Sequence, residues 1–512
     1  MRQENLITVS SIVAIFILPT VTGLFAAEAF SIQVVDEASR RGVPLVELKT
    51  TSGQTFVTDS AGRVAISDPV LLRRTVFFHV SGHGYEYPQD GFGYRGKALD
   101  ITPGREAILR IKRLNIAERL YRVTGAGIYR DSATLGKGVP ITHPLINAQV
   151  TGQDSVQAVV TGKRIFWFWG DTNRLRYPLG NFNTSGATSL LPQAGGLDPN
   201  DGVNLQYFAN KSGFSRPMFE PEPGILIWID GLFTVMGPKG EERVVTHFSR
   251  RKSLDEQLSH GVAVFNHDTN RFDPIVQLDQ KQLVHPRGQS FRQQEDGKEY
   301  ICFADPYAVT RVQASWDAVI DPNQYEAFTP LSEKSLEAIP ENLDRTDAGR
   351  LNFDWKSATN PVSASDLQRW VQMKVIDETD NRFRTIDVAT GKPISLHRGS
   401  IQWNDFRRRW VMIAHELGGK SSFLGEVWYA ESKNSTGPFA KAVKIATHNG
   451  YSFYNVSHHK FFDQENGKLI YFEGTYTTLF SKTKTPTPLY DYNQIMYRLD
   501  MADPRLSSAF IH

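Results

Sequence analysis

The sequence predicts an all-β protein: an N-terminal β-sandwich followed by a five-bladed β-propeller. Short alternating strands separated by turn sequences fill residues 30–114, and later segments repeat one strand–turn–strand form. The chain is also rich in aromatic side chains, with 31 Phe, 18 Tyr and 9 Trp, which suits a sheet-built protein. Its 512 residues exceed the roughly 250–300 at which a single core usually stops growing, so two or more domains are expected.

The amino-acid composition limits the kinds of partner and cofactor that we expect for this protein. There are 57 Lys plus Arg and 55 Asp plus Glu, so the net charge of +2 provides no basic field and we expect no nucleic-acid partner. The single cysteine, Cys302, excludes an internal disulfide and a Cys-rich zinc site. His458 and His459 do not suggest a metal site, because neighbouring strand residues point to opposite faces. We therefore expect no cofactor and no metal.

The first 29 residues have the layout of a secretory signal peptide. Arg2 precedes an apolar stretch from Leu6 to Ala27, and Ala27-Glu28-Ala29 is a small-x-small triplet after which cleavage is expected. We therefore expect a secreted or periplasmic protein without stable membrane insertion after cleavage. The alternative is an uncleaved membrane anchor, because the apolar run is about long enough to span a bilayer.

Residues 30–114 are predicted to form the sandwich, with strands at 31–35, 55–57, 75–80 and 107–111. The segment resembles the transthyretin-like, carboxypeptidase-regulatory-type β-sandwich family. The matching residues are Gly42-Val43-Pro44-Leu45, Thr58-Asp59-Ser60-Ala61-Gly62, Gly84-Tyr85 and Pro103-Gly104. The resemblance implies a non-catalytic accessory module. We expect this domain to fold independently, because its strand set closes by Arg113.

From residue 115 to residue 512 the sequence repeats one unit: a strand, a polar turn, and a hydrophobic strand ending in an acid. The four clear copies run from Asp154 to Asp171, His285 to Asp305, His397 to Glu416 and Tyr454 to Glu473, and a weaker copy runs from Ile225 to His247. Repeated antiparallel units are typical of propeller blades, and this length fits five blades with insertions. The main insertion is expected at 311–396, with a short helix at 364–371. The alternative is two unrelated sandwiches.

The geometry of a blade places the acids of these repeats together. An innermost strand starts at the central axis and its hairpin partner returns to the same rim, so the two ends meet at one mouth of the channel. The acids expected to act there are Asp154, Asp171, Glu416 and Glu473. Convergent carboxylates suit glycosidic bond cleavage, in which a protonated acid donates to the leaving oxygen while an ionised partner activates water or attacks carbon. Crowding like charges raises one carboxyl pKa and so separates the two roles.

Six further side chains are expected to bind the substrate at the same mouth. They are Trp169, His285, Arg287, His397, Arg398 and Tyr454. His and Arg there could hold sugar hydroxyls, sulfate or carboxylate. Each candidate also has a structural interpretation: Asp171 in Gly170-Asp171-Thr172-Asn173 could be a strand-end turn, and the His and Arg loops could be solvated turns.

Three motifs resemble the five-bladed propeller glycoside hydrolases, especially a family first catalogued as a domain of unknown function and later linked to endo-D-arabinanases. They are Gly152-Gln153-Asp154-Ser155, Trp169-Gly170-Asp171-Thr172, and Tyr429-Ala430-Glu431-Ser432 with Gly437-Pro438-Phe439. The wider clan includes arabinanases, xylosidases and fructosidases. The resemblance implies furanose or pyranose glycoside cleavage, with Asp154 and Asp171 in the two-aspartate pattern of the first blade. The clan's usual Glu-Gly-Pro acid motif is absent, and Glu473-Gly474-Thr475 matches it only in part.

The sequence therefore predicts a glycoside hydrolase acting on a polysaccharide or oligosaccharide, with Asp154 and Asp171 as the acid/base pair and Glu416 or Glu473 assisting. One alternative is a non-catalytic glycan-binding propeller, which would use the same mouth without a matched acid and base. Another is a polysaccharide lyase acting on an acidic glycan. In a lyase, Tyr454 or His285 would abstract a proton and an arginine, Arg287 or Arg398, would neutralise a uronate.

Overall fold

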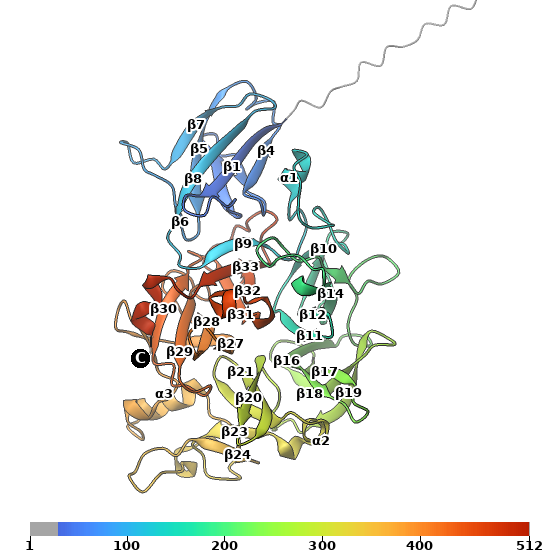
Figure 1. The fold of residues 1–512 in the computed structure, drawn as a ribbon, viewed down its shortest axis with the longest axis vertical. Coiled ribbons are helices and arrows are strands. Elements are labelled where there is room, and N and C mark those ends of the chain that lie inside the picture. The colour runs from blue at the N-terminus through green and yellow to red at the C-terminus, as the bar shows by residue number, and fades with distance from the viewer. Residues whose placement is uncertain (1–28, 511–512) are drawn as a thin grey trace, which may run out of the picture.

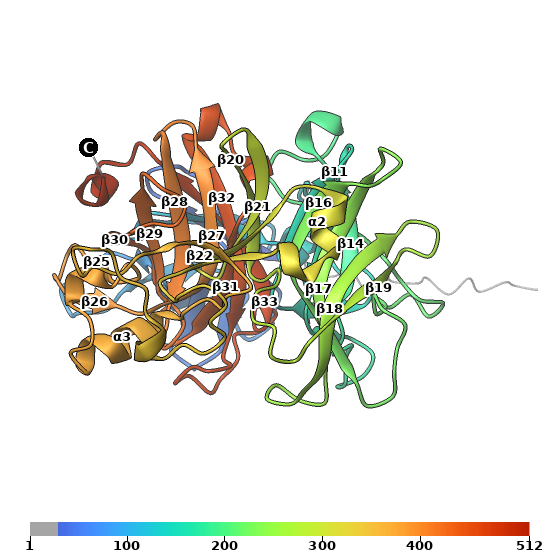
Figure 2. The ribbon, with the colours of Figure 1, turned by 90° about the horizontal axis from the view of Figure 1, so that it is seen from below.

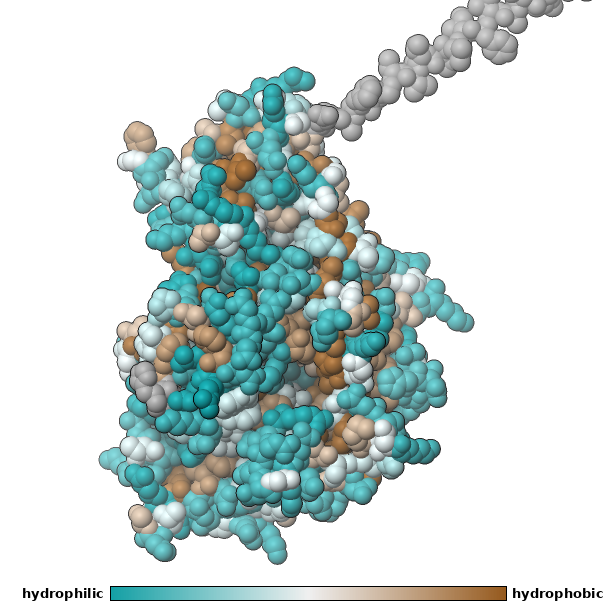
Figure 3. All heavy atoms as spheres, viewed as in Figure 1, coloured by the Kyte–Doolittle hydropathy of each residue, from teal (hydrophilic) through white to brown (hydrophobic). Residues whose placement is uncertain are grey.

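The computed structural model describes residues 29–510, which form an N-terminal sheet and a five-bladed β-propeller (Figure 1). Apart from Ala29, the predicted signal segment lies outside the described residues. Among residues 29–510, no helix combines the length and the apolar character needed to cross a bilayer. Hydrophilic side chains cover most of the face seen in Figure 3.

The N-terminal sheet has eight strands in the order β3-β2-β5-β6-β8-β1-β4, with β7 paired to β5. The strands are β1 (Phe30–Asp36), β2 (Val46–Thr50), β3 (Thr55–Val57), β4 (Arg63–Ile66), β5 (Thr75–Gly82), β6 (Tyr85–Glu86), β7 (Gly96–Asp100) and β8 (Glu106–Arg113). Within this sheet, β1 and β8 pair in parallel and the other pairs are antiparallel. In β2 the buried Val46 and Leu48 alternate with exposed residues, so one face of the sheet packs into a core of its own. The four predicted strands lie within β1, β3, β5 and β8.

The first four strands of each blade pair antiparallel, and the first strand of the blade faces the centre of the ring in Figure 1. From the first blade to the fifth, consecutive first strands are in contact. The first blade contains β11 (Gln157–Thr161), β12 (Arg164–Trp169), β14 (Ser185–Leu190) and β15 (Gln206–Tyr207). The second contains β16 (Leu226–Met236), β17 (Glu242–Arg251), β18 (Gln257–Asn266) and β19 (Arg271–Leu278). The third contains β20 (Gln289–Glu295), β21 (Lys298–Ala304), β22 (Ala308–Gln313), β23 (Glu326–Thr329) and β24 (Asp354–Ser357).

The fourth blade contains β27 (Leu396–Asn404), β28 (Arg409–Glu416), β29 (Val427–Ser432) and β30 (Lys441–Ala446), extended by β25 (Thr385–Asp387) and β26 (Pro393–Ile394). Beside it in Figure 2 lies α3 (Ala364–Gln372), which Ser363 caps and which confirms the predicted helix. The predicted start of the insertion at 311–396 is too early, because β23 and β24, which lie within this range, are strands of the third blade. The other helices are α1 (Arg130–Thr134) and α2 (Trp316–Ile320), and β10 (Val150–Gln153) pairs with β13 (Thr172–Arg174).

The fifth blade closes the ring with strands from both ends of the propeller sequence. It contains β31 (Ser452–His458), β32 (Leu469–Thr477), β33 (Asn493–Asp500) and, outermost, β9 (Glu118–Arg122). Because β9 precedes the first blade, its hydrogen bonds to β33 join the start of the ring to its end. The five-bladed fold is thus confirmed by strand pairing.

The same β9 strand also holds the N-terminal sheet against the propeller. The Arg119 guanidinium is 1% exposed and donates hydrogen bonds to the carbonyl oxygens of Pro44 (3.0 Å), His83 (3.1 Å) and Leu45 (3.3 Å). Nearby, the Tyr490 hydroxyl donates to the carbonyl oxygen of Thr58, just after β3, at 2.7 Å. Buried polar contacts of this kind are expensive to break, because each unpaired group stays away from water.

We predict that Arg119→Met lowers the free energy of unfolding of the full chain by about 2–4 kcal/mol, because three buried carbonyls lose their donor. Urea unfolding at neutral pH measures the change. The control is Arg505→Met, which removes an exposed arginine paired with Asp503 and should change stability by less than about 1 kcal/mol. Equal effects of the two substitutions would show that Arg119 does not stabilise the contact between the N-terminal sheet and the propeller.

Candidate active site

A cavity of about 700 Å³ lies where the first strands of the five blades meet. One residue in each blade adopts a left-handed backbone at this level: Ser155 (φ 58°), Gly231 (φ 57°), Gly288 (φ 71°), Arg398 (φ 41°) and Asn455 (φ 52°). The strand register shifts at the same level in β16, β27 and β31. Bulges of this kind redirect side chains, and the residue before each left-handed position lines the cavity. These residues are Asp154, Asp230, Arg287, His397 and Tyr454.

Two of the left-handed positions require glycine. A Cβ atom on Gly288 would lie 1.9 Å from the carbonyl oxygen of Ala304, and one on Gly231 would lie 2.5 Å from the carbonyl carbon of Pro286. At Arg398 and Asn455 a non-glycine residue bears the conformation, which typically costs of order 1 kcal/mol or more. Such strain is characteristic of functional sites, where the surrounding contacts hold it in place.

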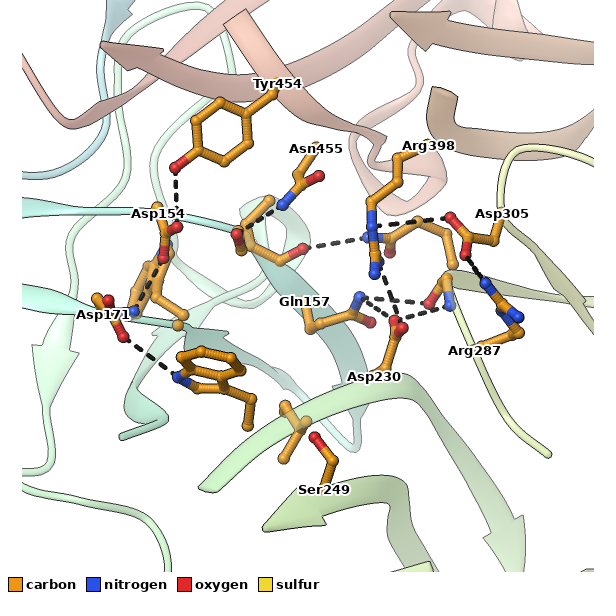
Figure 4. A pocket seen from close by; sticks show the side chains of 18 of the residues that line it. Asp154, Gln157, Asp171, Asp230, Ser249, Arg287, Asp305, Arg398, Tyr454 and Asn455 are labelled. Atoms are coloured by element: carbon orange, nitrogen blue, oxygen red, sulfur yellow. Dashed lines mark hydrogen bonds and ion pairs between the residues drawn. The ribbon is translucent and has the colours of Figure 1, made fainter. Parts of the chain in front are cut away.

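Asp154 and Asp171 form a carboxylate pair on one side of the cavity (Figure 4). Asp154 comes just before β11 and Asp171 just after its partner β12, as the hairpin argument predicted. The Asp171 backbone N–H donates to Asp154 Oδ1 at 2.9 Å, and the Tyr454 hydroxyl donates to Asp154 Oδ2 at 2.9 Å. On the other side, Trp228 Nε1–H donates to Asp171 Oδ1 at 3.2 Å.

Burial is the main cause that raises the pKa of both carboxyls. The pKa of Asp171 rises to about 7, since the Asp154 charge adds to the effect of burial and only Trp228 opposes it. For Asp154 the hydrogen bonds from Tyr454 and the Asp171 amide offset part of the rise. Hydrogen bonds to a carboxylate favour its ionised form. The pair therefore favours a proton on Asp171 and a charge on Asp154.

The opposite side of the cavity holds a network of two largely buried carboxylates and two partly exposed arginines (Figure 4). Arg287 donates to Asp305 Oδ2 through Nη2 at 2.8 Å and Nε at 3.1 Å. Arg398 lies between the acids, with Nη1 3.3 Å from Asp230 Oδ2 and Nε 3.8 Å from Asp305 Oδ1. Asp230 also accepts the Gly288 N–H at 2.7 Å.

The arginines give these two acids different pKa shifts. Burial would raise the pKa of Asp305, but Arg398 and Arg287 outweigh it and hold that pKa well below its ordinary value. Burial raises the pKa of Asp230 despite the opposing charge of Arg398. The Asp305 and Asp230 carboxylates in turn raise the pKa of Arg398. Asp305 and Arg398 are therefore a charged pair at neutral pH.

Most of the predicted site residues lie together. Asp154, Asp171, Trp169, His285, Arg287, His397, Arg398 and Tyr454 all line the cavity. Glu416 and Glu473 are not among its described lining residues, and their predicted place at the mouth is wrong. Strand β32 continues to Thr477, so Glu473 lies inside the strand, fully buried, 3.1 Å from His459 Nε2. Glu416 does end β28, but its carboxylate accepts the Trp428 indole N–H of β29 at 2.9 Å.

Four further residues line the cavity that were not predicted as site residues from the sequence: Trp228, Asp230, His247 and Tyr492. Asp230 was not predicted because it lies in the weakest repeat, inside the first strand β16 and not at its end. This strand is 11 residues long and continues past the bulge that follows Asp230. A signal was nevertheless present, since Asp230-Gly231 has the same form as Arg287-Gly288: a polar side chain before a residue that tolerates a left-handed backbone.

No protein-family model matches the chain. The curated proteins also contain no match. Solved structures found as similar include an exo-β-1,3-galactanase from Phanerochaete chrysosporium with β-1,3-galactotriose, at 10% identity and TM-score 0.35 over 77% of this chain and 66% of that one. Others are an N-acetylgalactosamine deacetylase from F. plautii (10%, 0.36, 76% and 98%) and an exo-1,5-α-L-arabinanase from a bovine ruminal metagenomic library (9%, 0.33, 69% and 94%). These values are too low to assign an activity, and the propeller is established by the strand pairing of the chain itself.

We predict that Arg398→Met lowers the free energy of unfolding by about 1.5–3 kcal/mol at pH 7, because Asp230 and Asp305 lose the partly exposed cation between them while Arg287 still pairs with Asp305. The pKa of Asp305 is lowered in the folded protein, so its pairing stabilises the fold above the unfolded-state pKa of about 3.9 and less as the pH falls below it. The difference between variant and wild type should therefore shrink toward pH 3. Urea unfolding over this pH range measures it.

The control for this prediction is Arg251→Met. Arg251 lines the same cavity and donates hydrogen bonds to neutral groups, namely Ser249 Oγ, the Leu254 carbonyl oxygen and Gln257 Oε1. Its loss should cost less than about 1.5 kcal/mol, with little dependence on pH. A pH-independent loss in Arg398→Met would show that the ion network is not what the arginine stabilises.

Proposed function

We propose that the cavity hydrolyses glycosidic bonds of a polysaccharide or oligosaccharide. The observation that carries the proposal is the pair formed by Asp154 and Asp171, in which the pKa of Asp171 is raised to about 7. A carboxyl group still protonated near neutral pH can donate to a leaving oxygen, and an ionised partner can act on water. This difference in protonation within one pair of acids is what glycoside hydrolysis requires.

In the proposed reaction, the glycosidic bond to the anomeric carbon breaks and a bond from that carbon to the oxygen of water forms. The Asp171 proton passes to the glycosidic oxygen as the bond from that oxygen to the anomeric carbon breaks. The oxygen of a water molecule bonds to the anomeric carbon, and its proton passes to the Asp154 carboxylate. Tyr454 orients Asp154 through its 2.9 Å hydrogen bond, and Trp228 does the same for Asp171.

The cavity also suits a saccharide in size and lining. Its volume of about 700 Å³ lies within the roughly 300–1,000 Å³ usual for ligand pockets. The rings of Trp228, Tyr454, Phe480 and Tyr492 line it together with charged and amide side chains. Aromatic faces beside hydrogen-bonding groups match the apolar faces and hydroxyl rims of sugars.

The lyase alternative is less well supported. Arg287 and Arg398 are already paired with Asp305 and Asp230, so neither cation is unpaired for a uronate. Burial, followed by the Arg287 charge, lowers the pKa of His285 to about 3, which makes its imidazole a weak base. A glycan-binding propeller differs from the proposal in one measurable respect: it would bind saccharides without cleaving them.

We predict that Asp171→Asn and Asp154→Asn each reduce turnover at least 10²-fold, because each keeps the size of the side chain but removes its proton chemistry. Release of oligosaccharides from a polysaccharide panel measures turnover. In the wild type, kcat/KM should fall as the pH rises above about 7, where Asp171 loses its proton.

The matched control is Glu416→Gln, an equally conservative change of an acid that lies outside the cavity lining, which should keep wild-type turnover. Full activity in Asp171→Asn with the melting temperature unchanged would refute the catalytic role. Binding without cleavage across the whole panel would favour the glycan-binding alternative.

We also propose that the protein is exported and that residues 1–29 are removed. The support is the apolar run and the Ala27-Glu28-Ala29 triplet, followed at once by the first strand at Phe30. The N-terminal residue of protein recovered outside the cytoplasm of its native host should therefore be Phe30. Recovery of the chain with Met1 intact would contradict the cleavage.

A further inference from the structure

Three histidines from separate segments gather at one side of the cavity. His247 lies on β17, His260 on β18 and His285 in the loop before β20. One ring nitrogen of each lies within 4.8 Å of the others. The rings of His247 and His285 stack with centroids 4.1 Å apart. Within residues 29–510 this is the one group of three or more His, Cys, Asp or Glu side chains found close enough to share a metal ion.

Backbone carbonyls fix two of these rings in a form that can bind a metal. His260 Nε2 lies 2.7 Å from the Asp279 carbonyl oxygen, and His285 Nδ1 lies 3.0 Å from that of Pro286. A carbonyl oxygen only accepts, so both nitrogens carry the hydrogen. The lone pairs are then on His260 Nδ1 and His285 Nε2. Metal-binding histidines characteristically donate their second N–H to a carbonyl or carboxylate in this way.

The third ring completes the donor set. His247 Nε2 lies 2.9 Å from His260 Nδ1, which already bears a lone pair, so in the metal-free protein His247 donates the hydrogen between them. A metal ion would replace that hydrogen. Tetrahedral coordination with bonds of about 2.0–2.1 Å places ligand nitrogens about 3.3 Å apart. The His247 and His260 rings need to separate by a few tenths of an ångström, whereas the His285 nitrogen, which lies within 4.8 Å of the other two, has to approach them.

The site has a closed side and an open side. His247 and His285 line the cavity, whereas His260 is 2% exposed and lies behind them. Arg287 is a nearby positive charge, but its ion pair with Asp305 compensates it. Three imidazoles with a fourth position facing a cavity form the donor set of a catalytic zinc site. Calcium and magnesium prefer oxygen ligands and are not expected here.

We propose that His247, His260 and His285 bind one divalent transition-metal ion, with Zn²⁺ the best match, and that its fourth coordination position opens into the cavity. The ion would bind an oxygen donor of a ligand there, such as a hydroxyl or carboxylate group. This inference goes beyond the proposed glycoside hydrolysis, because the acids Asp154 and Asp171 lie in another part of the cavity and need no metal.

The test is direct metal binding by the full chain without saccharide. Protein stripped with a chelator is dialysed against ZnCl₂, and bound zinc is counted by mass spectrometry. We expect one zinc per chain and a melting temperature that rises with zinc concentration. Loading with Co²⁺ should give the visible absorption bands of a tetrahedral nitrogen site. Less than about 0.2 zinc per chain at micromolar free zinc would overturn the proposal.

The variants separate this site from adventitious binding. His260→Gln and, independently, His285→Gln should weaken zinc binding at least 10²-fold and abolish the cobalt spectrum, with the metal-free melting temperature reporting whether each variant folds. His267→Gln, an exposed histidine, and His397→Gln, a cavity histidine outside the cluster, should keep one zinc. Retention of zinc by both cluster variants would refute the assignment.

The variant Asp171→Asn tests the glycosidase proposal and the metal-site proposal separately. This variant should keep the zinc while losing turnover. Zinc binding by an inactive wild type would refute only the glycosidase, and turnover by a protein that binds no zinc would refute only the metal site.

Discussion

The centre of the propeller depends on charge neutralisation among Asp230, Arg398, Asp305 and Arg287. These residues come from the second, third and fourth blades, and their side chains meet at one side of the cavity, with the carboxylates largely buried and the arginines partly exposed. Two unpaired carboxylates at this depth would repel each other, and each would lose its hydration. Arg398 resolves this by lying between them, even though its own backbone takes the left-handed conformation at φ 41°. The strain at this residue is offset by contacts to two acids.

Within the same cavity, the pKa of one aspartate is lowered and the pKa of another is raised. Asp305 faces two arginines and its pKa is held low, whereas Asp171 faces Asp154 and an indole and its pKa is raised to about 7. Distance along the chain plays no part in this difference; only the nearby charges and the degree of burial do. The side of the cavity with Asp154 and Asp171 is therefore where we propose proton transfer near neutral pH, and on the side with the two arginines the carboxylate of Asp305 keeps a fixed negative charge.

The sequence predicted the ring of blades and the first-blade acid pair, because strand periodicity and hairpin spacing are local properties. It failed where tertiary contacts decide. The sequence predicted that the strand ends at Glu473, but β32 continues to Thr477. No residue pattern near Glu473 indicates this continuation. Asp230 escaped notice because its bulge sits inside a long strand. The histidine cluster could not be predicted from spacing, since His247 and His260 lie on paired strands of the second blade and His285 reaches them from the loop that leads into the third.

The five left-handed residues explain how a symmetric scaffold carries an asymmetric site. Each blade has one left-handed residue at or just before its first strand at the same level, and the residue before it lines the cavity, whatever its identity. Gln157 links these contributions: its amide N–H donates to both Asp230 Oδ1 and the Gly288 carbonyl oxygen at 3.3 Å. The strand that follows Asp154 is thereby fixed to the opposite side of the cavity. A ligand bound between the acid pair and the histidine cluster would thus meet rigid groups on both sides, and such pre-organisation is the condition under which their chemistry becomes selective.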